Sequence, residues 1–195
     1  MFSIEHPDVI PIAVVAAIAI FLAREGLETF RRYKANARKL DAIRKLIAAE
    51  CERNHFVINR MLQQLSEIAG AMEAERHISI EPTIRGIPRL AFRDADGEMG
   101  GSSPVSPVHF AATEKYLFET AALEAGLFDL MERALTALSE VNHIRDSMIQ
   151  YVSEEPMYLD GFTEYAIEEL NDALDEIRNL YLRCTGEPLA RHRVR

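Results

Sequence analysis

The chain has 195 residues, of which 48% are hydrophobic and 27% are charged, and its formal net charge is -9. A chain of this length and composition can bury a core of its own, which excludes an intrinsically disordered or collagen-like protein. With only Cys51 and Cys184 it is not a disulfide-rich secreted scaffold, and we expect both to be small core thiols.

The charges are distributed unevenly along the chain. Residues 24–45 contain eight basic and three acidic side chains, whereas residues 46–195 contain 14 basic and 26 acidic ones. A basic block between an apolar run and an acidic body is typical of a membrane anchor, and the positive-inside rule then places residues 1–8 outside and the C-terminal domain in the cytoplasm, at the inner membrane if the source is bacterial. The acidic body lacks the basic surface of a nucleic-acid-binding protein.

The predicted single-pass anchor covers residues 9–27. Residues 9–23 carry no charge, and as a helix they measure about 22 Å, short of the ~30 Å hydrocarbon core. We expect Arg24 to reach the lipid headgroups and the bilayer to thin locally. A buried helix of a soluble protein is the alternative interpretation. The side chains expected to face membrane lipid are Ile10, Ile12, Val14, Val15, Ile18, Ile20, Phe21 and Leu22.

Small residues four positions apart recur in the anchor. Ala13 pairs with Ala17 in this spacing, and Ala19 pairs with Ala23. Such pairs allow close approach of two helices, which predicts association of the anchor and a homo-oligomer.

Residues 28–77 form a predicted long amphipathic, coiled-coil-like helix. Apolar residues alternate at spacings of three and four, and eleven of the thirteen seam positions are apolar. These positions are Phe30, Tyr33, Ala37, Leu40, Arg44, Ile47, Cys51, Asn54, Ile58, Met61, Leu65, Ile68 and Met72.

Residues 78–106 interrupt the helical pattern with three prolines and four glycines. Residues 87–92 resemble a strand and residues 94–97 a turn, so this irregular connector is expected to contain at most a small β-hairpin.

Two further helices are predicted in residues 107–185, before a basic tail at 186–195. The first follows Ser106-Pro107 and ends before Pro156; the second begins at Asp160 and ends at Gly186. The fold class is therefore all-α, with three amphipathic helices in an antiparallel bundle. The expected seams are Leu127, Met131, Ala134, Leu138, Val141, Arg145, Met148 and Val152, followed by Ala166, Leu170, Ala173, Ile177, Leu180 and Cys184.

Two Glu-x-x-His pairs are the candidate metal ligands: Glu52 with His55, and Glu140 with His143. Carboxylate-bridged di-iron bundles use two such pairs and two further glutamates, all projecting inward. The heptads here place Glu140 and His143 away from the seam, so no metal or cofactor is expected.

Three polar residues, Arg44, Asn54 and Arg145, occupy predicted seam positions. They are interpreted either as residues that fix the register of the helices or as a polar layer that senses a ligand.

No catalytic motif is present, which predicts a protein that is not an enzyme. The leading hypothesis is a membrane-anchored helical adaptor or scaffold with a cytoplasmic protein partner. The alternatives are a membrane-perturbing effector, such as a toxin or antiviral-defence component, and a metal-binding protein. The expected partner-binding residues lie in the connector: Arg85, Arg89, Leu90, Phe92 and Arg93. The alternative interpretation is that the connector is a plain linker.

Overall fold

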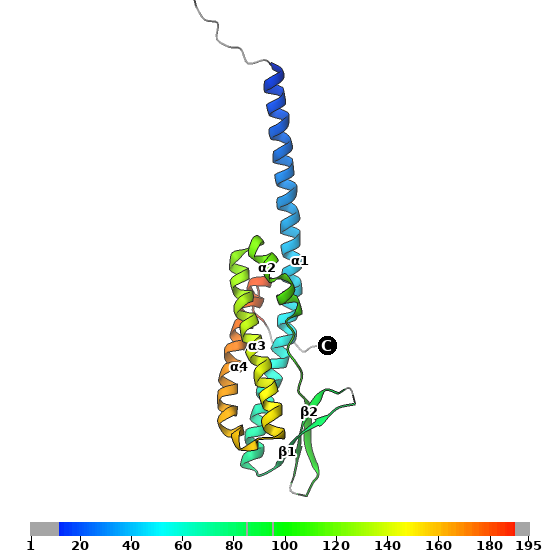
Figure 1. The fold of residues 1–195 in the computed structure, drawn as a ribbon, viewed down its shortest axis with the longest axis vertical. Coiled ribbons are helices and arrows are strands. Elements are labelled where there is room, and N and C mark those ends of the chain that lie inside the picture. The colour runs from blue at the N-terminus through cyan, green and yellow to red at the C-terminus, as the bar shows by residue number, and fades with distance from the viewer. Residues whose placement is uncertain (1–11, 85, 95, 190–195) are drawn as a thin grey trace, which may run out of the picture. The chain divides into compact units, whose positions relative to one another are not determined.

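The computed structural model describes residues 12–84, 86–94 and 96–189 and divides the chain into two compact units, Met1–Ala42 and Ile43–Arg195. The protein is mostly helical, with a small three-stranded antiparallel sheet (Figure 1). The elements are α1 (Ile12–Glu73), β1 (His77–Pro82), β2 (Pro88–Arg93), β3 (Met99–Pro104), α2 (Ala111–Leu123), α3 (Ala125–Ser153), the 3-10 helix η1 (Pro156–Tyr158) and α4 (Leu159–Thr185).

The prediction of a membrane anchor at residues 9–27, and with it the membrane localisation, is wrong. No helix within residues 12–84, 86–94 and 96–189 combines the length and apolarity needed to cross a bilayer. The apolar run of α1 ends at Ala23, and Arg24, Glu25 and Glu28 follow within the next turns. The effector hypothesis depends on the same span and loses its basis with it.

The residue roles assigned within that anchor are corrected as well. The prediction that these side chains face membrane lipid requires a spanning helix and is wrong without one: Ile12, Val14, Val15, Ile18, Ile20, Phe21 and Leu22. The predicted pairing of anchors inside a bilayer through the small residues Ala13, Ala17, Ala19 and Ala23 is wrong for the same reason. Residues 9–11, including Ile10, lie outside the described part of the chain.

The first unit contains residues 12–42 of α1. From Ala13 to Ala42 every side chain is exposed except Leu40, which is half-buried. Phe30, Tyr33 and Ala37, predicted as seam residues, therefore have no covering element within residues 12–42. The helical periodicity is present here, and a packed face is not.

The second unit begins where α1 acquires a buried stripe. The predicted seam of this part of α1 is confirmed, because each of its residues from position 47 to 68 is buried: Ile47, Cys51, Asn54, Ile58, Met61, Leu65 and Ile68. The seams of α3 and α4 are also buried, apart from Arg145 and Cys184, which are partly exposed. Ile144 takes the core position next to Arg145. The apolar spacing thus locates the core stripes of three helices.

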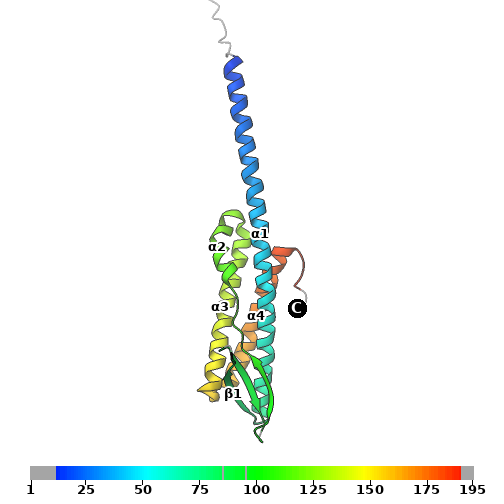
Figure 2. The same cartoon turned by 90° about the vertical axis from the view of Figure 1, so that its right-hand side faces the viewer.

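The prediction of one helix from residue 107 to the region before Pro156 is wrong at Glu124. This residue is extended, with φ -160° and ψ 99°, and separates α2 from α3. The chain reverses there, so that α3 runs in the same direction as the buried part of α1 and α4 runs opposite to both (Figures 1 and 2). Because of this reversal, residues 153–161 and the sheet lie at the same end of the bundle.

The connector folds into a three-stranded meander in the order β1-β2-β3, which is more structure than the predicted hairpin. The turn predicted at residues 94–97 is confirmed: the Gly97 N–H donates to the Asp94 carbonyl (2.8 Å), and Gly97 has a φ of 83° that favours glycine. The central strand contributes Leu90, Ala91 and Phe92 to the core.

Candidate functional site

Three buried polar residues of α1 bind the strand β3, the chain that follows it, and the start of α2. Gln64 Nε2 donates to Ser103 Oγ (2.8 Å) and to the Pro104 carbonyl (3.0 Å). Asn54 donates to the His109 carbonyl and accepts from the His109 N–H (2.7 Å). These bonds fix residues 103–109 in an extended course antiparallel to α1, so Asn54 sets the register of the chain.

Glu50, the third of these residues, caps the N-terminus of α2 from a different helix. Its carboxylate accepts from the backbone N–H of Ala112 (2.8 Å) and Thr113 (3.0 Å) and from Thr113 Oγ1 (2.7 Å). The N-cap residue of α2 itself, Phe110, makes no capping hydrogen bond with its side chain. Glu50 is only 2% exposed, and the helix N-terminus stabilises its negative charge.

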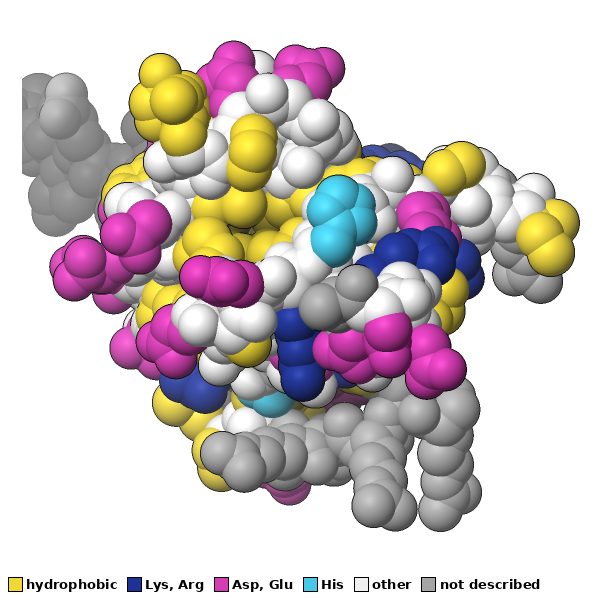
Figure 3. All heavy atoms as spheres, turned by 90° about the horizontal axis from the view of Figure 1, so that it is seen from below, with side chains coloured by type: hydrophobic (Ala, Val, Ile, Leu, Met, Phe, Trp, Pro, Cys, Tyr) yellow, Lys and Arg dark blue, Asp and Glu magenta, His cyan; other side chains and the backbone are white. Residues whose placement is uncertain are grey.

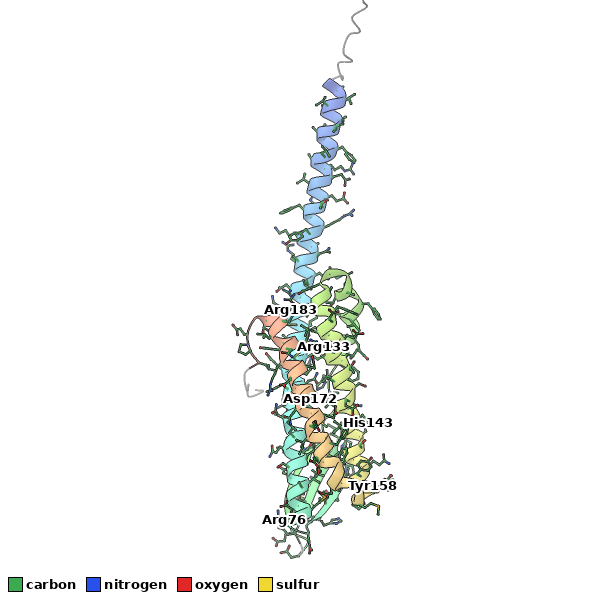
Figure 4. All side chains as sticks on the ribbon, turned by 90° about the vertical axis from the view of Figure 1, so that its left-hand side faces the viewer. Arg76, Arg133, His143, Tyr158, Asp172 and Arg183 are labelled. Atoms are coloured by element: carbon green, nitrogen blue, oxygen red, sulfur yellow. The ribbon has the colours of Figure 1, made fainter. Side chains whose placement is uncertain are left out.

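Glu124 joins three helices at the α2–α3 corner. Its carboxylate binds Arg44 Nη2 of α1 (2.6 Å) and Arg183 Nη2 of α4. Arg183 lies at the end of α4 opposite to the end where Arg76 and Tyr158 lie (Figure 4). The other polar seam residue, Arg145, donates to the Val105 carbonyl (3.3 Å). All three predicted polar seam residues thus have structural partners.

The two cysteine thiols lie near this corner. Burial raises the pKa of Cys184 to about 12, with Arg44 and Arg183 opposing the shift and Glu124 adding to it. Burial also raises the pKa of Cys51, and the nearby Cys184 and Glu50 add to the effect. Both thiols are free and remain protonated at neutral pH.

The two Glu-x-x-His pairs do not come together. Glu52 accepts from the Tyr181 hydroxyl (3.1 Å) and Glu140 from the Tyr165 hydroxyl (2.8 Å). The two tyrosines are sixteen residues apart on α4, which is about 24 Å along the helix. His55 is half-buried, and His143 is exposed on α3 (Figure 4). Within the described ranges no three His, Cys, Asp or Glu side chains are grouped to hold a metal ion.

The predicted partner-binding residues of the connector are largely used by the sheet itself. Arg89 Nη2 and Arg93 Nη2 bind the Glu81 carboxylate on β1 (2.5 Å and 2.7 Å), and these bonds lower the pKa of Glu81. Leu90 and Phe92 are core residues. Arg85 lies outside the described residues. Two large apolar residues of this hairpin, Ile84 and Ile87, are exposed.

A groove of about 560 Å³ runs between the last turns of α1 and the strands β2 and β3. Arg60, Glu67 and Arg76 contribute its charges and Phe92 its aromatic surface, and the remaining lining residues are small: Gly70, Ala71, Ala74, Gly100, Gly101 and Ser102. Seen from this end, the molecule shows hydrophobic side chains interspersed with charged ones (Figure 3). The sequence does not predict the groove, because its two walls come from separate parts of the chain and no local spacing relates them.

The exposed part of α1 is the other candidate interaction surface. Its large hydrophobic side chains are between 44% and 73% exposed: Val14, Val15, Ile18, Ile20, Phe21, Leu22, Leu27, Phe30 and Tyr33. The small residues predicted to pair, Ala13 with Ala17 and Ala19 with Ala23, are exposed as well. Apolar side chains surround the helix as far as Ala23, and beyond it they are interspersed with charged residues.

Comparisons with protein-family models, with curated proteins and with solved structures found no match. The function is therefore inferred from the two surfaces.

Proposed function

We propose that the protein is a non-enzymatic interaction module whose copies associate through residues 13–40 of α1. The observation that carries the proposal is the row of nine exposed large hydrophobic residues between Val14 and Tyr33. Soluble monomers rarely expose a contiguous apolar surface of more than a few hundred Å², and larger ones mark interaction sites.

The periodicity of this segment favours a second copy of the chain as the partner. Phe30, Tyr33, Ala37 and Leu40 continue the spacing of three and four that is used for packing after Ile43. Identical helices present this stripe to one another, and knobs-into-holes packing removes it from water. Residues 13–23 are apolar on all sides, which favours a bundle of more than two helices over a pair.

The basic residues of the segment are compatible with this arrangement. Arg32 Nη2 binds Glu28 Oε1 (2.5 Å) one turn away, so part of the positive charge is balanced within the same helix. Ala35 lies about 140° around the helix from Phe30 and marks the face expected to remain in water. This geometry provides a matched control for the association surface.

Sedimentation equilibrium of the full chain tests the proposal with Phe30→Asp and Ala35→Asp. Each substitution adds one carboxylate to an exposed helical position, but only Phe30→Asp places it in the stripe. We expect an oligomer for the wild type and for Ala35→Asp, and a dissociation constant at least about tenfold weaker for Phe30→Asp. A wild-type chain that stays monomeric at all concentrations contradicts the proposal, as does equal weakening by both variants.

A further inference from the structure

The edge of the sheet next to α1 is open at Ser102, whereas at Pro104 its outward carbonyl already accepts from Gln64 of α1 (3.0 Å). β3 pairs only with β2 in the sheet, and Val105 donates to the Pro88 carbonyl (2.8 Å) in the same register. In an antiparallel ladder alternate residues bond to the neighbour, so Gly101 and Ser103 bond to β2 like Val105. Ser102 lies opposite Ala91 between them, and its N–H and C=O therefore point away from β2.

The side chains along this edge leave room for another backbone. β3 has the sequence MGGSSP, without the charged residues that usually block pairing at an edge strand. A Cβ atom added at Gly101 would meet nothing within 4 Å, and its φ is not in the positive range. The open space beside Gly101 is part of the groove that Gly70 and Ala71 line from α1.

The length of the groove fits a short extended segment. From Arg60 to the end of α1 at Glu73 the helix rises about 20 Å, which equals about six residues of a strand. Peptides that add to a sheet edge beside a helix obtain affinity from main-chain hydrogen bonds and specificity from the side chains that line the groove.

Arg60 gives the groove a charge that selects its ligand. It donates to the neutral Gln63 Oε1 (2.7 Å), and it has no carboxylate partner among residues 12–84, 86–94 and 96–189. Arg76 already binds Asp94 Oδ1 (3.0 Å), and Glu67 accepts from Gln63 Nε2 (2.8 Å). Arg60 is therefore the groove's available cation, and a carboxylate on the ligand complements it.

We propose that an extended segment of a partner protein binds in this groove, adds to β3 as a fourth strand, and places an acidic side chain against Arg60. This interaction is separate from the association of α1, so either proposal can fail without the other. It gives each copy of the module a defined site for the partner.

Fluorescence anisotropy with the full chain tests the site. The probes are six labelled hexapeptides of alternating Val and Thr, blocked at both ends, each with a single Asp at a different position. Matched probes carry Asn in place of Asp, or N-methyl groups on alternate residues. We expect saturable binding of at least one Asp peptide, binding at least about fivefold weaker for its Asn counterpart, and no binding of the N-methylated form.

Three variants locate the binding. Ser102→Pro removes the outward N–H, while Ser102→Ala keeps it, and an edge strand tolerates proline where its N–H faces outward. Gly101→Val fills the groove without altering the outward hydrogen-bonding groups. Arg60→Gln removes the charge. We expect about tenfold or greater loss for Ser102→Pro and Gly101→Val, little change for Ser102→Ala, and equal binding of Asp and Asn peptides for Arg60→Gln.

Several results overturn the proposal. One is the absence of saturable binding by all six Asp peptides. Another is unchanged binding in Gly101→Val, which decides the matter if Ser102→Pro does not fold by circular dichroism. Displacement of the peptide by an equal concentration of inorganic phosphate identifies a simple anion site instead and also overturns it.

Discussion

The helix α1 has two parts that share a periodicity and differ in what covers them. Residues 13–42 are exposed apart from the half-buried Leu40, whereas after Ile43 residues three or four positions apart are almost completely buried. Phe30 and Ile58 are both predicted seam residues of one heptad series, yet Phe30 is 62% exposed and Ile58 is 0% exposed. A heptad pattern therefore identifies a face that packs and leaves open whether its partner lies in the same chain.

Ile58→Asp tests this difference with the largest expected effect. A carboxylate at a fully buried seam position has no cation to pair with, so we expect a loss of about 3–5 kcal/mol in the free energy of unfolding. Phe30→Asp introduces the same group at an exposed position and should leave the unfolding of residues 43–189 within about 0.5 kcal/mol of the wild type. Urea titrations followed by circular dichroism measure both, and similar losses contradict the assignment of the two parts.

Glu50→Ala gives the next largest effect, because the buried part of α1 also holds α2 in place. The substitution leaves two backbone N–H groups and one hydroxyl without their acceptor, and we expect a loss of about 2–3 kcal/mol. Glu50→Gln keeps one acceptor oxygen and should recover part of this loss. Glu52→Ala is the control, since Glu52 is exposed and accepts one bond from Tyr181. Equal losses at positions 50 and 52 contradict the capping role.

The sequence predicts the local features of this fold better than those that depend on distant contacts. The seams of α1 after Ile47, of α3 and of α4 follow from apolar spacing, and the end of α4 follows from Gly186, whose φ is 77°. The break at Glu124 is not predicted, because Glu124 is neither a glycine nor a proline and its ion-pair partners Arg44 and Arg183 come from two other helices. The sequence does not predict the third strand, because MGGSSP lacks β-branched residues and pairs with β2 and Gln64, which are distant in the sequence.

In the candidate site, too, the sequence predicts local features better than those that depend on distant contacts. Asn54 is buried at its predicted seam position, but its partner His109 is 55 positions away and no local spacing indicates it. Arg89 and Arg93 are basic residues of the connector and are predicted to bind a partner, but both form ion pairs with Glu81 on the neighbouring strand. The groove depends on the approach of β3 to α1, which follows from the bonds of Gln64 and not from any motif.

Glu124→Gln is expected to have a smaller effect than the loss of Glu50. The amide can still accept one hydrogen bond, but both ion pairs with Arg44 and Arg183 lose their charge. Arg183 is partly exposed, so solvent screens its share, and we expect a loss of about 1 kcal/mol. Increasing salt should weaken the wild type toward the variant, as urea titrations at two ionic strengths will measure. A difference that does not change with salt contradicts an electrostatic role for this corner.

The thiols near the same corner provide the smallest effect and the one that depends on pH. Burial raises the pKa of Cys184 to about 12 and also raises that of Cys51, so between pH 9 and 12 the folded chain holds protons that the unfolded chain releases. Stability should therefore fall as the pH rises through 9, by about 0.4 kcal/mol for each thiol at pH 9 itself.

Cys184→Ser removes one of the two thiols. The free energy of unfolding, measured by urea titration between pH 8 and 9.5, should then fall less steeply with pH than in the wild type. This range lies below the ordinary tyrosine pKa, and the pKa values of Tyr165 and Tyr181 are raised further by their bonds to Glu140 and Glu52 and by burial.

In the folded protein both thiols should also react slowly with a disulfide reagent at pH 8, because the thiolate is the nucleophile. Rapid modification of two thiols per folded chain, with an unchanged circular dichroism spectrum, contradicts burial of the α1–α4 contact. That result would mean that α1 is exposed after Ile43 as well as before it.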